Sequence, residues 1–166
     1  TELAGRLAQA LGGRGPAPVQ GRPESGQDLS GTGLQRALQQ QEFMLHYQPI
    51  VAAGTREVCA VEALLRWPRG RELAPLEAAE FVPVAEKSGF IVDLGDWVLR
   101  SACAQFDAWR REGLLLDFVA VNVSPRQLGA GGFAASVLAT LRAFDMRPAQ
   151  LQLEFPAALL AALDAV

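Results

Sequence analysis

Three apolar runs that alternate with helical segments constrain the fold of this chain most strongly. Nearly continuous apolar stretches occur at residues 58–64, 117–124 and 151–155. Apolar strands joined by helices are typical of a sheet whose strands run parallel and whose two faces are both buried. The pattern therefore predicts an α/β fold, with helices over residues 33–43, 75–89, 93–113 and 133–145. The third of these helices is expected to stop at Gly113. Its expected shared face consists of Trp97, Leu99, Cys103, Phe106 and Trp109.

An oxygen-bearing side chain closes each of the three apolar runs: Glu62, Asn122 and Glu154. Functional groups of parallel α/β folds collect at the carboxyl ends of the strands. Two carboxylates and an amide carbonyl suit Mg²⁺ or Mn²⁺ better than zinc. Arg66, placed just past the end of its strand, could reach a phosphate at the same rim. A plainer alternative is that Glu62 pairs with Arg66 while Asn122 and Glu154 only cap loops.

Composition limits the partners of the chain. The net charge of −3 gives no basic field for duplex nucleic acid. Cys59 and Cys103 lack the close spacing of a zinc or redox pair, so we expect buried free thiols in a reducing compartment. No signal peptide begins the sequence and no apolar run reaches the roughly 18 residues of a membrane span. We expect a cytoplasmic protein without a membrane span.

His46, the only histidine, is not predicted to be a general base. It lies in an alternating strand over residues 43–49, next to Tyr47 in the sequence. Alternation turns neighbouring side chains to opposite faces, so we expect a half-exposed strand residue that points away from Tyr47.

A segment rich in Gly and Pro divides the chain near residue 33. Residues 12–33 contain almost no large apolar side chains, which predicts a linker. Upstream of it, one helical face carries Leu3, Leu7 and Leu11. We expect residues 1–33 to be an upstream helix remnant with a flexible linker, and residues 34–166 to form the folded domain.

Five sequence motifs follow one another in this domain. In chain order they read LHYQPIV, VEALLRW, FVPVAEKSGFIVDLGDWVL, VNVSPRQL and LQLEF. In order and spacing they resemble the EAL domain, a family that hydrolyses the bacterial second messenger cyclic di-GMP. The resemblance runs from about residue 34 to residue 166. It implies a TIM-like (β/α)₈ barrel whose first strand, here residues 43–49, runs antiparallel to the others.

The resemblance also implies roles for six residues. The implied metal ligands, of which Glu62 is also the catalytic residue, are Glu62, Asn122 and Glu154. The residues implied to bind the dinucleotide are Gln48, Leu64 and Arg66. The implied reaction is attack of a metal-activated water on one phosphodiester to give linear pGpG, with two Mg²⁺ or Mn²⁺ ions in the complete domain.

The sequence departs from the family pattern near its end. After Glu154 the family continues Thr-Glu-Ser, whereas this chain continues Phe155-Pro156-Ala157. The family's later Asp-Asp pair, lysine, Glu and Gln have no counterpart before Val166. A (β/α)₈ barrel takes about 250 residues, so we expect only the N-terminal half of the barrel. We also expect that these 166 residues alone do not hydrolyse cyclic di-GMP.

Three functions stay open. The chain is a piece of an EAL phosphodiesterase, a degenerate module that binds cyclic di-GMP without cleaving it, or a protein-interaction remnant. The intact Glu62, Leu64 and Asn122 favour the first, and the altered residues 156–158 favour the second. The resemblance implies an upstream sensor or GGDEF domain as a partner, and it leaves a homodimer open.

Overall fold

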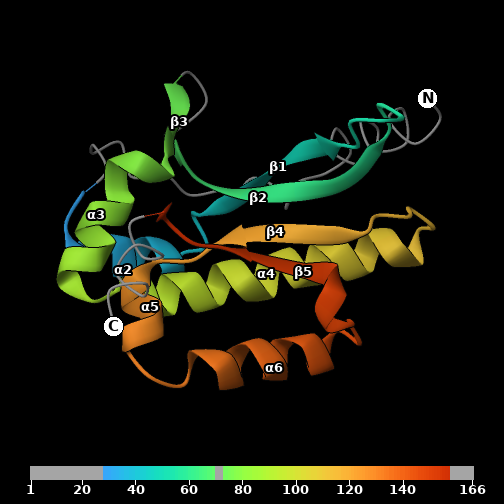
Figure 1. Cartoon of the computed structure of the whole chain (residues 1–166). Coiled ribbons are helices and arrows are strands. Elements are labelled where there is room, and N and C mark those ends of the chain that lie inside the picture. Colours follow the sequence, from blue (N-terminus) through green and yellow to red (C-terminus); the bar gives the residue numbers. More distant parts are fainter. Residues whose placement is uncertain (1–27, 70–72, 158–166) are drawn as a thin grey trace.

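The computed structural model of the chain describes residues 28–69 and 73–157 (Figure 1). The helices in this part are α2 (Gly31–Gln39), α3 (Ala78–Ser88), α4 (Ile91–Arg111), α5 (Pro125–Gly129) and α6 (Phe133–Ala143), with a 3₁₀ turn η1 (Pro148–Gln150). The strands are β1 (Met44–Val51), β2 (Val58–Arg69), β3 (Leu73–Glu77), β4 (Phe118–Asn122) and β5 (Leu151–Glu154).

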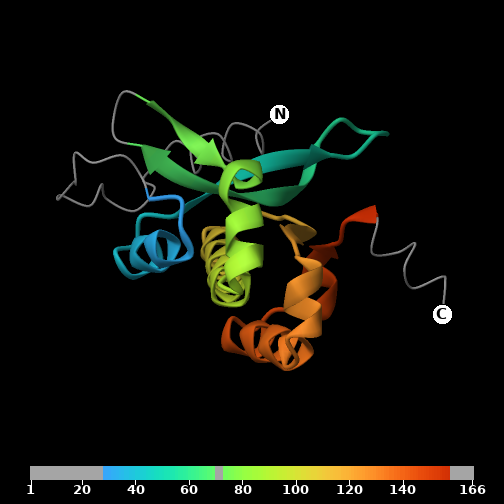
Figure 2. The ribbon, with the colours of Figure 1, turned by 90° about the vertical axis from the view of Figure 1, so that its left-hand side faces the viewer.

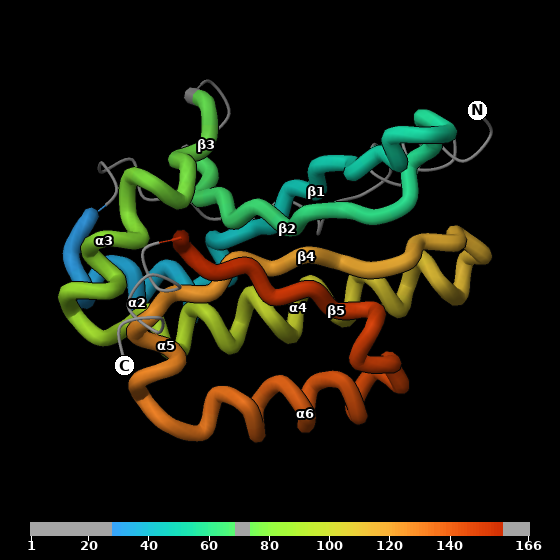
Figure 3. Tube along the Cα trace, viewed as in Figure 1, coloured from blue at the N-terminus to red at the C-terminus, as the bar shows by residue number. Residues whose placement is uncertain are grey.

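The strands form one mixed sheet in the order β1-β2-β4-β5, with β3 pairing with the far end of β2. β1 runs antiparallel to β2, whereas β2, β4 and β5 run parallel to one another. After β4 the chain turns through α5 and returns along α6 to β5 (Figure 3). The predicted α/β class and the antiparallel first strand are confirmed.

Helices cover one face of the sheet, as Figure 2 shows from the side. Along β2 the side chains alternate: Val61 and Ala63 are buried on the helical side, while Glu62 and Leu64 are only half-buried on the other. The prediction of a sheet with both faces buried is therefore wrong within the described residues. One helical face and one polar face are what the wall of a barrel has, because its second face points inward.

The core lies between the sheet and α4. Four of the five residues predicted to share one face of this helix are buried: Leu99, Cys103, Phe106 and Trp109. The fifth, Trp97, is partly buried against the same core. The predicted stop is also confirmed, since the helix ends at Arg111 and Gly113 adopts a left-handed φ of 80°.

Several predicted boundaries are wrong. The helix predicted over residues 33–43 ends at Gln39. β2 does not end at residue 64 but continues to Arg69, and residues 75–77, predicted as the first turn of a helix, belong to strand β3. The two segments pair with each other antiparallel, and this pairing overrides the helix propensity of residues 75–77. β1 continues through Pro49, which an edge strand tolerates because its outer side needs no N–H donor.

The predicted domain boundary near residue 33 stays a prediction. Residues 1–27, which include the predicted upstream helix and most of the linker, lie outside the described residues. The described chain enters α2 at Gly31, where the Ser30 hydroxyl accepts a hydrogen bond from the Gly33 N–H at 3.1 Å. None of the helices in residues 28–69 and 73–157 is long and apolar enough to cross a membrane.

Candidate functional site

The sheet register brings the three predicted oxygen ligands together on the face without helices. Asn122 lies directly opposite Glu154, and Glu62 pairs with Ala120, two residues before Asn122. Residues two apart on a strand share a face, so all three side chains project to the same side. The Asn122 Nδ2 donates a hydrogen bond to the Glu62 Oε1 at 2.7 Å. The predicted parallel arrangement and shared rim are therefore confirmed.

Glu62 has a different partner from the one the plainer alternative gave it. Arg66 pairs with Glu77 on β3 at 3.5 Å and donates to the backbone carbonyl of Leu65 at 3.0 Å. Residues four apart on a strand share a face but are about 13 Å apart along it, which explains why Glu62 and Arg66 do not pair. Arg66 also lies inside β2 rather than past its end, because the pairing with β3 lengthens that strand.

The three side chains each keep one oxygen available. In the described part of the chain, no hydrogen bond is found for the Glu62 Oε2, the Asn122 Oδ1 or the Glu154 Oε2. The Glu154 Oε1 accepts from the Gln152 Nε2 at 3.0 Å. Residues 28–69 and 73–157 contain no group of three or more His, Cys, Asp or Glu side chains that could hold a metal ion. Two carboxylates and one amide oxygen are a donor set that suits a hard cation with several water ligands, such as Mg²⁺.

The predicted substrate-binding residues border this cluster. Gln48 lies opposite Glu62 on the neighbouring strand, and Leu64 and Arg66 follow Glu62 on the same face of β2. His46 lies opposite Leu64 and is exposed, whereas a half-exposed residue was predicted. The sequence alone did not place His46 beside the predicted pocket. Its position follows from the antiparallel register of β1 with β2, which puts the start of β1 at this rim.

A hydrogen-bonded turn supports the end of β4. Its Ser124 hydroxyl donates to the Glu86 Oε1 on α3 at 2.7 Å and caps α5. The Val123 N–H donates to the backbone carbonyl of Glu154 at 2.8 Å. Sequence reasoning missed Glu86; the capping-box pattern in SPRQL could have identified the turn but not its partner on another helix.

The layer beneath the site is apolar and uncharged. The Tyr47 ring packs edge-on against Trp109, with ring centroids 4.7 Å apart. Burial, and secondarily the nearby Cys103, raises the pKa of Tyr47 above its usual range, and burial raises the pKa of the Cys103 thiol to about 11. Both side chains are therefore uncharged near neutral pH. Cys103 is buried as predicted, whereas Cys59 is only partly buried.

The fold and this oxygen cluster define a barrel-wall α/β domain with a candidate cation and phosphate site at its carboxyl-end rim. The EAL domain family model matches residues 32–166. The chain therefore belongs to the EAL domain family, which confirms the resemblance seen in its motifs.

Relatives of known function lie within the same family. The bifunctional diguanylate cyclase/cyclic di-GMP phosphodiesterase MucR of Pseudomonas aeruginosa is 40% identical over 123 residues, which are 73% of this chain and 18% of MucR. The cyclic di-GMP phosphodiesterase PdeR of Escherichia coli is 41% identical over 97 residues, 58% of this chain and 14% of PdeR. The chain thus spans less than a fifth of either relative.

The fold is also similar to a solved EAL structure. The PaMucR phosphodiesterase in complex with c-di-GMP superposes with a TM-score of 0.73 at 36% sequence identity. The match covers 81% of this chain and 54% of that chain. The described sheet and helices therefore correspond to about half of that phosphodiesterase.

Proposed function

We propose that this domain binds cyclic di-GMP on the polar face of its sheet and takes part in its metal-dependent hydrolysis to linear pGpG. The observation that carries the proposal is the clustering of Glu62, Asn122 and Glu154, each with an oxygen available, at one rim. The family membership and the phosphodiesterase names of MucR and PdeR support the same reaction.

The three oxygen ligands would hold a divalent cation, Mg²⁺ or Mn²⁺. The Asn122 Nδ2 already donates to Glu62, so its Oδ1 is the atom left for a cation, and the same hydrogen bond orients the Glu62 carboxylate. When bound, the metal would supply a water of lowered pKa and stabilise charge on the phosphate, in a site of two ions in the complete domain.

The substrate contacts come from the same face. In the reaction, a water oxygen forms a bond to phosphorus, the bond to a ribose 3′ oxygen breaks, and that oxygen takes up a proton. Arg66 would contact a non-bridging phosphate oxygen with guanidinium donors beyond those used for Leu65 and Glu77. Gln48 and Leu64, which flank Glu62, would line the dinucleotide pocket.

A second candidate is a domain that binds cyclic di-GMP without cleaving it. One observation favours it: the residues after Glu154 are Phe155, Pro156 and Ala157, which bring no further carboxylate to the rim. The two functions share the binding face and differ in turnover.

Calorimetry and chromatography separate the outcomes. The chain is titrated with cyclic di-GMP in the presence of Mn²⁺, and the mixture is then analysed for pGpG. We expect saturable binding that Arg66→Ala weakens by about 1.5–3 kcal/mol, as for a lost charge-assisted contact. Glu57→Gln, which removes a carboxylate from an exposed position before β2, is the matched control for Glu62→Gln.

The possible outcomes of this experiment support different functions. Turnover that is lost in Glu62→Gln but kept in Glu57→Gln supports the phosphodiesterase and contradicts the expectation that these 166 residues alone are inactive. Binding without pGpG agrees with that expectation for either candidate, and the two candidates then differ in their use of metal. Mn²⁺ binding that Glu62→Gln weakens supports the phosphodiesterase, whereas binding of cyclic di-GMP by a chain that binds no Mn²⁺ favours the second candidate. If the chain does not bind cyclic di-GMP with or without Mn²⁺, both candidates are wrong.

A further inference from the structure

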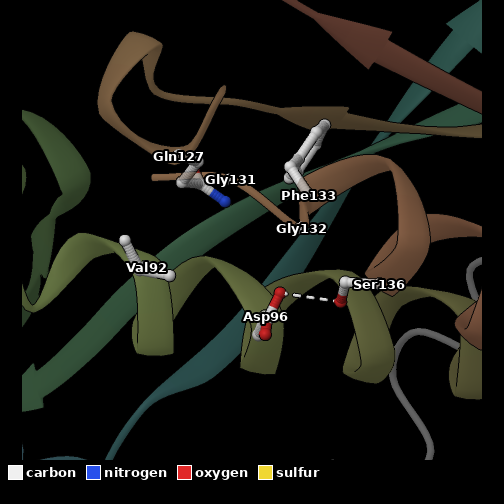
Figure 4. A pocket seen from close by; sticks show the side chains of 7 residues that line it. All are labelled: Val92, Asp96, Gln127, Gly131, Gly132, Phe133 and Ser136. Atoms are coloured by element: carbon white, nitrogen blue, oxygen red, sulfur yellow. Dashed lines mark hydrogen bonds between the residues drawn. The ribbon is translucent and has the colours of Figure 1, made fainter. Parts of the chain in front are cut away.

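A cavity of about 220 Å³ lies between α4, α5 and α6, on the helical side of the sheet (Figure 4). Asp96, Gln127, Phe133 and Ser136 line it, together with the glycine turn that precedes α6. We propose that this cavity binds a small planar ligand that carries an N–H donor beside a C=O acceptor, as a lactam or a primary amide does.

Gln127 supplies a buried donor without a partner. The residue is 6% exposed, and its Oε1 accepts the Ser124 N–H at 2.9 Å. This hydrogen bond fixes which end of the amide is nitrogen, and in the described chain the Nε2 has no acceptor. Figure 4 shows the nitrogen pointing into the cavity. A buried donor left unpaired costs free energy, so its orientation indicates a ligand acceptor at this point.

The neighbouring helix leaves room for that amide. A Cβ at Gly95 of α4 would overlap the Gln127 Nε2. Any larger residue at this position would displace the amide from the cavity wall. The glycine therefore makes the position of the donor possible, and it offers a way to move the donor without changing charge.

Asp96 supplies the acceptor. Its Oδ1 accepts from the Ser136 hydroxyl at 2.9 Å, which holds the carboxylate at the cavity edge. Within residues 28–69 and 73–157 no hydrogen bond is found for the other carboxylate oxygen. An inorganic anion would be repelled by Asp96, and a simple cation would leave the Gln127 donor unpaired. A neutral ligand with an adjacent donor and acceptor satisfies both groups.

Size and shape narrow the ligand class further. Pockets for drug-sized ligands have volumes of roughly 300–1,000 Å³, so a smaller cavity suits a single ring or an amide group. Phe133 and Val92 contribute apolar surface to the lining of the cavity. A flat lactam ring could contact this surface while its edge reaches Asp96 and Gln127.

Two probes that differ by one donor test the proposal. Backbone amide resonances of the 166-residue chain are followed by NMR during titration with 2-pyridone and, separately, with 1-methyl-2-pyridone. The second compound has the same ring and carbonyl but lacks the N–H. We expect 2-pyridone to shift the resonances of Gly131 and Gly132 saturably, and the methylated probe to bind about tenfold more weakly.

Two variants test the residues. Gln127→Glu keeps the acceptor for the Ser124 N–H but replaces the donor by an acceptor, so we expect about tenfold weaker binding of 2-pyridone. Gln35→Glu, the same change on an exposed position of α2, should leave the affinity unchanged. Gly95→Ala displaces the amide without adding charge and decides the question if Gln127→Glu does not fold.

The proposal is overturned by any of three results. The first is equal affinity for the two probes. The second is unchanged 2-pyridone binding in a folded Gln127→Glu or Gly95→Ala variant. The third is the absence of shifts around the cavity up to the solubility limit of 2-pyridone.

Discussion

Removing the Ser124 hydroxyl should loosen the turn that follows Asn122. This hydroxyl makes two hydrogen bonds: it accepts the Arg126 N–H at 3.2 Å and donates to the Glu86 Oε1 at 2.7 Å. The first caps α5, and the second ties the turn to α3. Ser124→Ala loses both bonds, whereas Glu86→Ala loses only the second.

The two contributions differ in size. Loss of a Ser N-cap costs about 1 kcal/mol, and loss of a hydrogen bond to a charged group costs about 1.5–3 kcal/mol. Ser124→Ala should therefore lower the free energy of unfolding by roughly 2.5–4 kcal/mol. Glu86→Ala should lower it by about 1.5–3 kcal/mol, and the double variant by little more than Ser124→Ala alone.

Urea unfolding followed by tryptophan fluorescence measures all four proteins of this cycle. We expect a coupling energy of about 1.5 kcal/mol or more between Ser124 and Glu86. Additive losses, with a coupling energy below about 0.5 kcal/mol, would refute the inference that Glu86 holds the turn.

Two further predictions concern α4. A hydrogen bond from the Arg110 guanidinium, together with a second arginine in the last turn, lowers the pKa of Asp107. The ionised carboxylate therefore stabilises the fold above the unfolded-state pKa of about 3.9, and this stabilisation is lost as the pH falls through the lower folded pKa. Asp107→Asn should therefore be less stable than the parent in urea at pH 7, and a gap that does not narrow below about pH 4 would contradict this. Burial raises the pKa of the Cys103 thiol to about 11. In a Cys59→Ser variant, Cys103 should therefore react with a disulfide reagent at pH 8 far more slowly in the folded chain than in the unfolded chain. Equal rates would show that Cys103 is accessible.

Local sequence patterns correctly predicted those helices and strands whose apolar side chains are the ones buried in the fold. The apolar spacing of Leu99, Cys103 and Phe106 identified α4 because the helix buries that same face. The apolar runs around Val119 and Leu153 identified β4 and β5, and their terminal oxygen residues identified the shared rim. These features follow from strand and helix geometry alone.

The features that the sequence did not predict depend on pairing between segments that are distant in the chain. The extension of β2 to Arg69 and the strand β3 exist because they pair with each other, although residues 75–77 are not strong strand formers. The hydrogen bond between Asn122 and Glu62 joins residues 60 apart in the sequence, and only the register of β2 with β4 reveals it. The antiparallel register of β1 with β2 places His46 at the rim.

The central claim is that Glu62, Asn122 and Glu154 form one divalent-cation site, and Mn²⁺ binding tests it most directly. Electron paramagnetic resonance distinguishes free from bound Mn²⁺ and reports an affinity without requiring turnover. We predict that Glu62→Gln, Asn122→Ala and Glu154→Gln each weaken Mn²⁺ binding by about tenfold or more, equivalent to ~1.4 kcal/mol, while Glu57→Gln does not. Equal Mn²⁺ affinity in the parent and all three site variants would contradict the account.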